Sequence, residues 1–426
     1  MLALVLVTGC SGGDDTSDAK RDPGRDRPGT SGDRNRVPAD LGAGRDVAHG
    51  LSTLLERRAD AVRTGNAAAF EAGLAGDPEL LAEQGRWFDG VTQLPLSTFD
   101  YTLDPASLVR DGRAYWGTVE VGLRLEEYDA RPVVTRDRFR FERSDGRFVV
   151  SSVTDRVWER ANPTTAQPWD LGPVEVREGS GVLGVFDAGS ADVAEEVVTA
   201  VENGVAALAP RIPLSWDHWV VVYALAEPTF LASLSGVPGG DPLAIDGLTF
   251  PVMAKPGSAR IAATRFVLNP RLLAADPASR DRLIRHELVH VALGSRDDRI
   301  PIWLSEGLAE YLSVRTLPPS ERVISGEALA AARAGLTVLP ATETFNEVGS
   351  LANYGVSWWV CEAIAETYGE QMLWTLVEEL DGVADPDARL QEVLGVSGRG
   401  VVREAGELML ATYEGEPEPT RNRNAS

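Results

Sequence analysis

The run His286-Glu287-Leu288-Val289-His290 restricts the fold more than any other feature of this chain. The whole chain contains only four histidines, so two of them at this spacing stand out from the composition. On a helix, residues four apart lie one above the other, about 6 Å apart along the axis. The segment is therefore predicted to be a helix whose two histidines share one metal ion.

The residues on either side predict where this helix begins and ends. Asp276 is a favourable N-cap residue, Pro277 suits the first helical position, and Gly294 can adopt the left-handed conformation that stops a helix. Glu287 is turned about 100° from His286 around the axis, so it flanks the metal rather than binding it. There it can take a proton from a zinc-activated water and later pass it to a leaving amine, which makes it the predicted catalytic base.

A second run, WLSEGLAEY at 303–311, supplies the remaining ligand. Its apolar residues form one face of a predicted helix, and Glu306 and Glu310 lie one turn apart on another face. A catalytic zinc needs three protein ligands and one open position, and Glu306 completes the set begun by the two histidines. Glu310 is expected to accept a hydrogen bond from the other ring nitrogen of a ligating histidine, His286; a solvated helix face is the alternative.

Together the two runs resemble the zinc motifs of the gluzincin metallopeptidases, in particular the compact peptidase MA-like group. A weaker likeness is the run NYGVSWWVCEAIAETYG at 353–369, and the whole resemblance covers about 174–380. It implies a zincin-like fold, Zn²⁺ bound by His286, His290 and Glu306, and an orienting role for Glu310.

The resemblance also implies a tyrosine beyond the second helix that donates a hydrogen bond to the oxyanion. Tyr354 is the candidate, and packing at a helix end is the alternative role for it. The interval from His290 to Glu306 is shorter than in the larger aminopeptidases and the thermolysin-like enzymes, so their substrate preferences are not transferred to this chain. No Gly-Ala-Met-Glu-Asn exopeptidase motif is visible, which leaves recognition of a free amino terminus without support.

The charge of the chain narrows its possible partners. A formal net charge of −23 argues against nucleic acid, because binding a polyanion requires a basic surface that releases counterions. A peptide or protein substrate is the expected partner, and nothing in the sequence indicates an oligomer.

The N-terminal segment indicates export. The apolar run MLALVLVTGC ends on a small residue and Cys10, which resembles a bacterial lipobox, so residues 1–10 are predicted to be a lipoprotein signal with Cys10 lipidated. No Lys or Arg precedes the run, so the translation start is expected further upstream. Residues 11–45 are predicted to be a disordered tether and 416–426 a disordered tail. The expected location is the extracytoplasmic face of the cell membrane.

The remaining chain is predicted to form two α+β domains. Two helical segments followed by alternating strands predict a domain at 46–158 in which helices precede a curved antiparallel sheet, as in the nuclear-transport-factor-like fold. Three prolines predict a linker at 159–173. The zincin-like domain is expected at 174–415, with a short strand at 265–268 proposed as the sheet edge on which an extended peptide pairs.

The sequence therefore predicts a membrane-anchored zinc metallopeptidase that hydrolyses peptide bonds. One alternative is a zincin-like lipoprotein without turnover that serves binding or assembly. Another is that the first domain binds a ligand and the peptidase domain is accessory. A buried polar pocket in the first domain would favour that second alternative, and an interior filled by aromatic side chains would argue against it.

Overall fold

The computed structural model describes residues 41–163, 166–237, 239–347 and 349–415. Contacts divide this part of the chain into two compact units, one up to Glu175 together with Val252–Ala263, and one made of Val176–Pro251 and the residues from Thr264 onward. The predicted signal with Cys10, the tether before residue 41 and the tail at 416–426 lie outside the described residues. Within the described residues, no helix is long and apolar enough to cross a bilayer.

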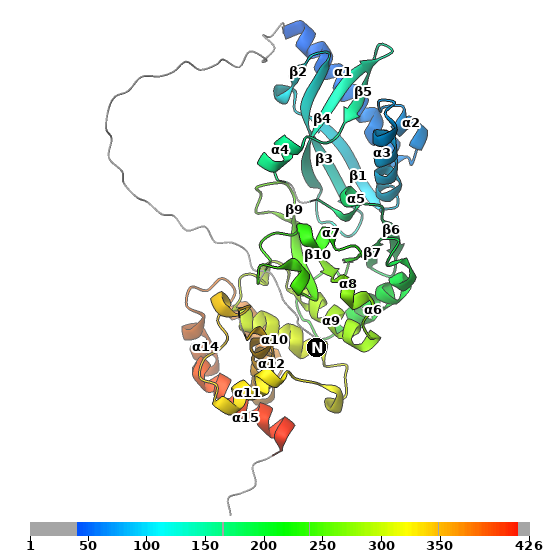
Figure 1. Ribbon diagram of the computed structural model, residues 1–426. Coiled ribbons are helices and arrows are strands. Elements are labelled where there is room, and N and C mark those ends of the chain that lie inside the picture. Colours follow the sequence, from blue (N-terminus) through cyan, green and yellow to red (C-terminus); the bar gives the residue numbers. More distant parts are fainter. Residues whose placement is uncertain (1–40, 164–165, 238, 348, 416–426) are drawn as a thin grey trace, which may run out of the picture. The chain divides into compact units, whose positions relative to one another are not determined.

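The first unit is built on a curled antiparallel sheet (Figure 1). Its strands pair in the order β1-β3-β4-β5. The short strand β2 pairs with the first residues of β3, which β1 does not reach. Strands β4 and β5 form a hairpin that turns at Asp145 and Gly146. The strand bounds are β1 Leu96–Leu103, β2 Val109–Asp111, β3 Ala114–Leu125, β4 Val133–Ser144 and β5 Arg147–Ser152.

Helix α1 packs against β1 and β5 of this sheet, and aromatic rings fill the space between the helices and the strands. Phe70 and Phe88 pack with ring centroids 4.7 Å apart, and Phe99 meets Tyr101 edge-on at 5.0 Å. The buried guanidinium of Arg58 lies over the Phe70 ring, 3.7 Å from its centroid. The helices are α1 Leu41–Arg63, α2 Ala67–Glu71 and α3 Pro78–Val91.

The prediction of a tether up to residue 45 is wrong at its end, because α1 begins at Leu41. The first five residues of the helix, LGAGR, show almost no apolar periodicity, so the sequence did not predict a helix there. Adding residues to an existing helix avoids the cost of nucleating a new one, so the strongly periodic segment downstream can extend towards the N-terminus.

The prediction of a linker at 159–173 is also wrong in part. Helix α4 (Arg156–Ala161) runs into this range and α5 (Pro168–Leu171) lies inside it. Trp169 is buried, and Trp87 of α3 donates its indole hydrogen to Asp170 at 3.1 Å. Proline was read as a sign of a linker, yet Pro168 occupies the first turn of a helix, where its missing N–H costs nothing.

The second unit contains a mixed sheet with the strand order β6-β7-β8-β10-β9. Strands β7, β8 and β10 are parallel, and β9 joins β10 through a connection too short for a parallel crossover, so it runs antiparallel. The strand bounds are β6 Glu175–Glu178, β7 Val182–Phe186, β8 Val220–Ala224, β9 Gly247–Met253 and β10 Ile261–Leu268.

This order corrects one expectation about the sheet. The strand predicted at 265–268 is the end of β10, and β10 lies between β8 and β9 rather than at the edge. Both sides of β10 are already hydrogen-bonded, so no peptide can add to it; β9 and β6 are the terminal strands. The pattern of apolar residues locates strands but carries no information on their lateral order.

Helices pack on this sheet and on one another to form an extended hydrophobic core. Helix α6 contacts β7 and α9, α9 contacts α10, and α12 lies against α10, α11, α13 and α15. The helix bounds are α6 Ala194–Leu208, α7 Thr229–Ser233, α8 Pro270–Leu273, α9 Pro277–Leu293, α10 Ile302–Ser313, α11 Gly326–Ala334, α12 Ser350–Tyr368, α13 Gln371–Glu379, α14 Pro386–Leu394 and α15 Gly398–Glu414. The predicted α+β class is confirmed, as is the curled antiparallel sheet of the first unit.

Candidate metal centre

Both histidines lie on helix α9, which is covered by neighbouring helices. Asp276 accepts a hydrogen bond from the backbone N–H of Ser279 at 3.0 Å, and Gly294 leaves the helical conformation with φ of 55°. These are the predicted helix ends. His286 and His290 are each 1% exposed, because α6 covers one side of α9 and α10 another.

Helix α10 brings Glu306 to the histidines because it packs unusually closely on α12. A Cβ atom added to Gly307 would lie 2.5 Å from the backbone oxygen of Ser357 and 2.7 Å from Cys361 Sγ. Only glycine allows this approach. The close packing fixes the depth of α10 in the core, and with it the position of the neighbouring Glu306.

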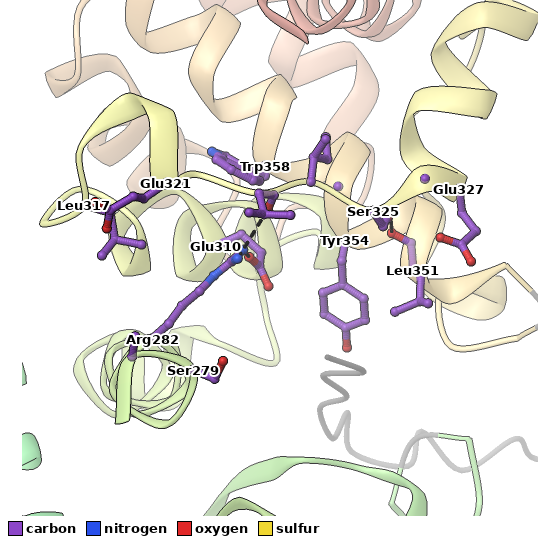
Figure 2. Close-up of a pocket in the computed structure, with 15 residues that line it drawn as sticks. Ser279, Arg282, Glu310, Leu317, Glu321, Ser325, Glu327, Leu351, Tyr354 and Trp358 are labelled. Carbon is purple, nitrogen blue, oxygen red and sulfur yellow. Dashed lines mark hydrogen bonds and ion pairs between the residues drawn. The ribbon is translucent and has the colours of Figure 1, made fainter. Parts of the chain in front are cut away.

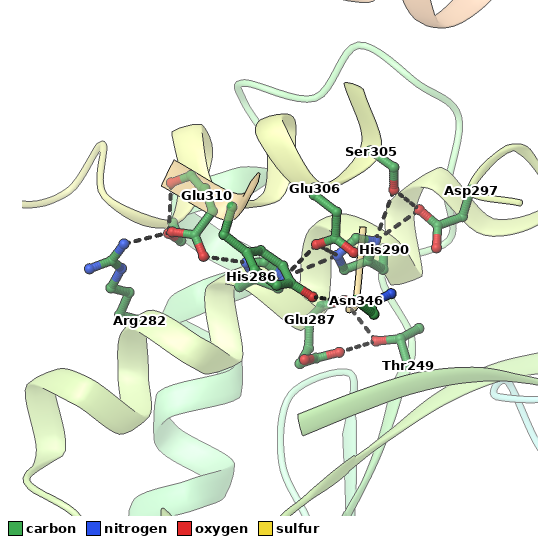
Figure 3. Close-up of polar contacts among 12 residues, drawn as sticks. Thr249, Arg282, His286, Glu287, His290, Asp297, Ser305, Glu306, Glu310 and Asn346 are labelled. Atoms are coloured by element: carbon green, nitrogen blue, oxygen red, sulfur yellow. Dashed lines mark hydrogen bonds and ion pairs between the residues drawn. The ribbon is translucent and has the colours of Figure 1, made fainter. Parts of the chain in front are cut away.

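Three ligand atoms converge on one point between the two helices (Figure 3). His286 Nε2 lies 3.2 Å from His290 Nε2 and 3.4 Å from Glu306 Oε2. His290 Nε2 lies 3.8 Å from the same carboxylate oxygen. Tetrahedral zinc with ligand bonds of about 2.0–2.2 Å separates its ligands by about 3.4 Å, so the three atoms have the spacing that one zinc ion requires.

The surroundings of Glu306 support the same conclusion. Its Oε2 atom is completely buried and accepts no hydrogen bond from any described residue. A buried carboxylate oxygen that accepts no hydrogen bond is costly, and a cation at the convergence point would satisfy it. Two neutral imidazoles and one carboxylate are a donor set suited to Zn²⁺, so the residues present fit this ion.

His290 is held in place by groups beyond the ligand set. Its Nδ1 lies 2.8 Å from Asp297 Oδ1, and Ser305 Oγ lies 3.3 Å from the same nitrogen and also donates to Asp297. A ring that donates from Nδ1 keeps the lone pair of Nε2 free for a metal. Burial opposes protonation of His290, but the nearby Asp297 and Glu306 outweigh it and raise the pKa of His290.

Glu310 lies beside His286, but in a looser contact than that of Asp297 with the other histidine, because His286 Nδ1 forms no hydrogen bond with a described residue. Glu310 Oε1 lies 3.4 Å from His286 Nδ1, and Oε2 of the same carboxylate accepts a hydrogen bond of 2.6 Å from Arg282 Nη2. Burial alone would raise the pKa of Glu310, yet Arg282 and His286 lower it to about 2. Burial would lower the pKa of His286, but Glu306 and Glu310 raise it to about 9. The site therefore concentrates negative charge that attracts a cation.

Glu287 lies beside the ligand set without joining it. The hydroxyl of Thr249, on β9, donates to Glu287 Oε2 at 2.6 Å, while Oε1 is buried without a hydrogen-bond partner among the described residues. Burial raises the pKa of Glu287, and the two histidines together with Thr249 oppose that rise. A Cβ atom on Gly247 would lie 2.7 Å from Glu287 Oε1, so β9 can pass this close only with glycine there.

Tyr354 reaches the site from the first turns of α12. Its ring centroid lies 6.4 Å from that of His286, and its hydroxyl donates to Asn346 Oδ1 at 3.4 Å. The ring packs edge-on against Phe345, and only 5% of the residue is exposed. Its position beside the ligand set is compatible with the predicted oxyanion donor and also with the packing role.

The structure thus brings together every predicted site residue except Cys10, which lies outside the described residues. The other two histidines are elsewhere: His49 lies in α1, and His218 precedes β8 in a left-handed conformation with φ of 63°.

Sequence reasoning missed several residues that contact the site: Thr249, Arg282, Asp297, Ser305 and Asn346. Arg282 precedes His286 by one helical turn and could have been found from that spacing. Asp297 and Ser305 lie between or within the two motifs, but no helical spacing rule connects them to His290. Thr249 and Asn346 come from distant segments and left no local signal.

Comparison with known proteins adds no identification: no family model matches the chain, and no curated protein matches it significantly.

Proposed function

We propose that this chain is a zinc-dependent peptidase that hydrolyses peptide bonds on the outer side of the cell membrane, held there by a lipid on Cys10. One observation supports it above the others. Three buried ligand atoms converge at zinc spacing, and a further buried carboxyl group, that of Glu287, stands beside them with one oxygen that has no hydrogen-bond partner among the described residues. The second unit would then be the gluzincin-like domain, and the first a nuclear-transport-factor-like spacer.

A bound Zn²⁺ would supply Lewis acidity, polarising the substrate carbonyl and making a water nucleophilic. Glu287 Oε1 is the atom that accepts the proton of the attacking water, because Thr249 already occupies Oε2. The same carboxyl then returns the proton to the leaving amine. Thr249 keeps the carboxylate in one orientation, and Asp297 and Glu310 keep both imidazole rings turned towards the convergence point. Tyr354 is the candidate donor to the oxyanion.

The alternative in which the first unit binds a ligand has one feature against it and one in its favour. Aromatic rings occupy much of the space beneath the curled sheet, where Arg58 is stacked on Phe70 and donates to Gln84. A cavity of about 280 Å³ nevertheless opens in the first unit, and Arg57, Arg58 and Asp60 are among the residues that line it. Binding of a ligand by the first unit therefore stays an alternative. The other alternative, a zinc-binding protein without turnover, is an outcome of the following experiment.

The test measures zinc content and proteolysis in parallel on the purified chain. We expect one zinc per chain in the wild type and in Glu287→Gln, and hydrolysis of a denatured protein substrate by the wild type alone, at least about 100-fold faster than by the variant. Zinc at one per chain without any Glu287-dependent hydrolysis would support the binding role. A wild type that binds no zinc would exclude both.

A further inference from the structure

A cavity of about 510 Å³ opens directly beside the candidate metal centre. It lies between the first turns of α9, the connection that leads into α11, and the first half of α12 (Figure 2). Two of its lining residues, Glu310 and Tyr354, also belong to the candidate site. A group bound in this cavity is therefore adjacent to the place where the reaction is proposed.

Part of the cavity wall is apolar and suits a long hydrocarbon stem. Ile324, Leu351 and Trp358 line it, and Figure 2 shows Leu351 and Trp358 beside Tyr354 on the α12 side. Trp358 is itself fixed, because its indole donates to Glu362 at 3.1 Å and the guanidinium of Arg282 lies over its ring. This wall is preformed and does not need to rearrange to accept an occupant.

The charges that line the cavity do not cancel. The one guanidinium, that of Arg282, is neutralised by Glu310 at 2.6 Å. Two further carboxylates remain, Glu321 and Glu327, and both residues are exposed. Neither side chain forms a hydrogen bond or an ion pair with any residue that the structure describes. The cavity thus combines an apolar wall with two negative groups that lack a partner.

We propose that this cavity binds a long basic side chain, lysine or arginine, of a peptide substrate next to the bond that is cleaved. The methylene stem packs on the apolar wall, and the cationic end reaches one of the two carboxylates, which lie at opposite sides of the cavity (Figure 2). An acidic side chain is repelled by the same two groups, and an apolar one leaves both without a counter-charge. The inference rests on the proposed peptidase function, whose substrate class it names.

The test begins with a mixture of random peptides whose cleavage sites are determined by mass spectrometry. We expect arginine and lysine to be enriched at one position adjacent to the cleaved bond. In the double variant Glu321→Gln/Glu327→Gln, the ratio of kcat/KM for an arginine peptide to that for its norleucine analogue should fall about fivefold to tenfold. In Glu321→Lys/Glu327→Lys it should shift towards acidic peptides. Glu378→Gln, an exposed carboxylate on α13, is the matched control and should keep the wild-type ratio.

A binding measurement separates this inference from the proposed function. Fluorescence polarisation with labelled arginine and norleucine peptides, on the zinc-loaded Glu287→Gln protein, should show at least fivefold tighter binding of the arginine peptide. Equal binding, or a preference that survives the double substitution to glutamine, would overturn the inference even if the wild type is an active peptidase. A wild type without hydrolysis that still shows the carboxylate-dependent preference would contradict the peptidase proposal while leaving the cavity assigned to basic side chains.

Discussion

Arg282 Nη2 on α9 lies 2.6 Å from Glu310 Oε2 on α10, so a guanidinium holds the carboxylate that faces His286. The pair is mostly buried, with side-chain exposures of 20% and 10%. The contacts run from Arg282 through Glu310 to His286, which belongs to the candidate metal centre. Fixing a ligand from outside in this way restricts the ring orientations that the unbound site can sample.

Replacing either member of this pair should weaken zinc binding in a graded way. Glu310→Gln removes the negative acceptor of His286 and should lower zinc affinity about 10-fold to 100-fold. Arg282→Gln leaves the carboxylate but frees it to move, so a smaller loss of about 10-fold is expected. Competition with a fluorescent chelator measures both affinities. The control is Arg403→Gln, at an exposed position on α15. If this variant lost as much zinc affinity as Glu310→Gln, the proposed role of the Arg282–Glu310 pair would be contradicted.

Gly247→Ala should reduce hydrolysis without removing zinc. The added methyl group would lie 2.7 Å from Glu287 Oε1, so the carboxylate must shift, whereas no ligand atom is touched. A displacement of about 1 Å at a reacting group can cost about 100-fold in rate. We expect kcat to fall by about 10-fold to 100-fold at unchanged zinc stoichiometry. Gly400→Ala on α15, whose Cβ would meet only ordinary contacts, should leave both quantities unchanged.

Much of this site could be predicted from sequence because its key residues are close together along the chain. The helical repeat places His286 above His290, and the second motif supplies Glu306. Pairing between distant segments could not be predicted, because apolar alternation locates strands without ordering them. Hence Thr249 was missed and β10 was taken for an edge strand. The same limit applies to Trp169, whose burial depends on α3 rather than on its own neighbours.

Gly307→Ala should destabilise the second unit strongly. Its Cβ would lie 2.5 Å from the backbone oxygen of Ser357, and backbone cannot move aside as a flexible side chain can. Overpacking of this kind costs about 1–3 kcal/mol, and we expect a value near the upper end in guanidinium unfolding. In the control Gly400→Ala, a helical position with space for the methyl group, the higher helix propensity of alanine should instead stabilise by about 0.5–1 kcal/mol. Equal effects of the two substitutions would contradict the close packing of α10 on α12.

Asp137 should make the first unit less stable as the pH rises from about 4 to 7. Burial raises the pKa of this carboxyl to about 7, and the negative charges of Asp170 and Glu159 add to the rise. Between the unfolded and folded pKa values the folded protein holds a proton that the unfolded chain has lost, so stability present at low pH is lost as the pH approaches 7.

Asp137→Asn removes this dependence because an amide does not ionise. Since the side chain is only half-buried, we expect the variant to be more stable than the wild type by about 1–2 kcal/mol at pH 8, less than the full shift implies. At pH 4 the two proteins should have equal stability. Urea unfolding at both pH values gives the comparison, and a difference that does not change with pH would show that Asp137 is not the titrating group.

All three candidate metal ligands come from α9 and α10, two helices joined by a short connection. An ion bound there would cross-link the two helices and close a small loop of chain, as a disulfide bridge does. The ion cannot leave unless α10 moves away from α9, and the close packing at Gly307 holds α10 against α12. Exchange of the ion with solution should therefore be limited by how often this three-helix stack separates, so the protein should retain its metal for long periods even at very low free zinc.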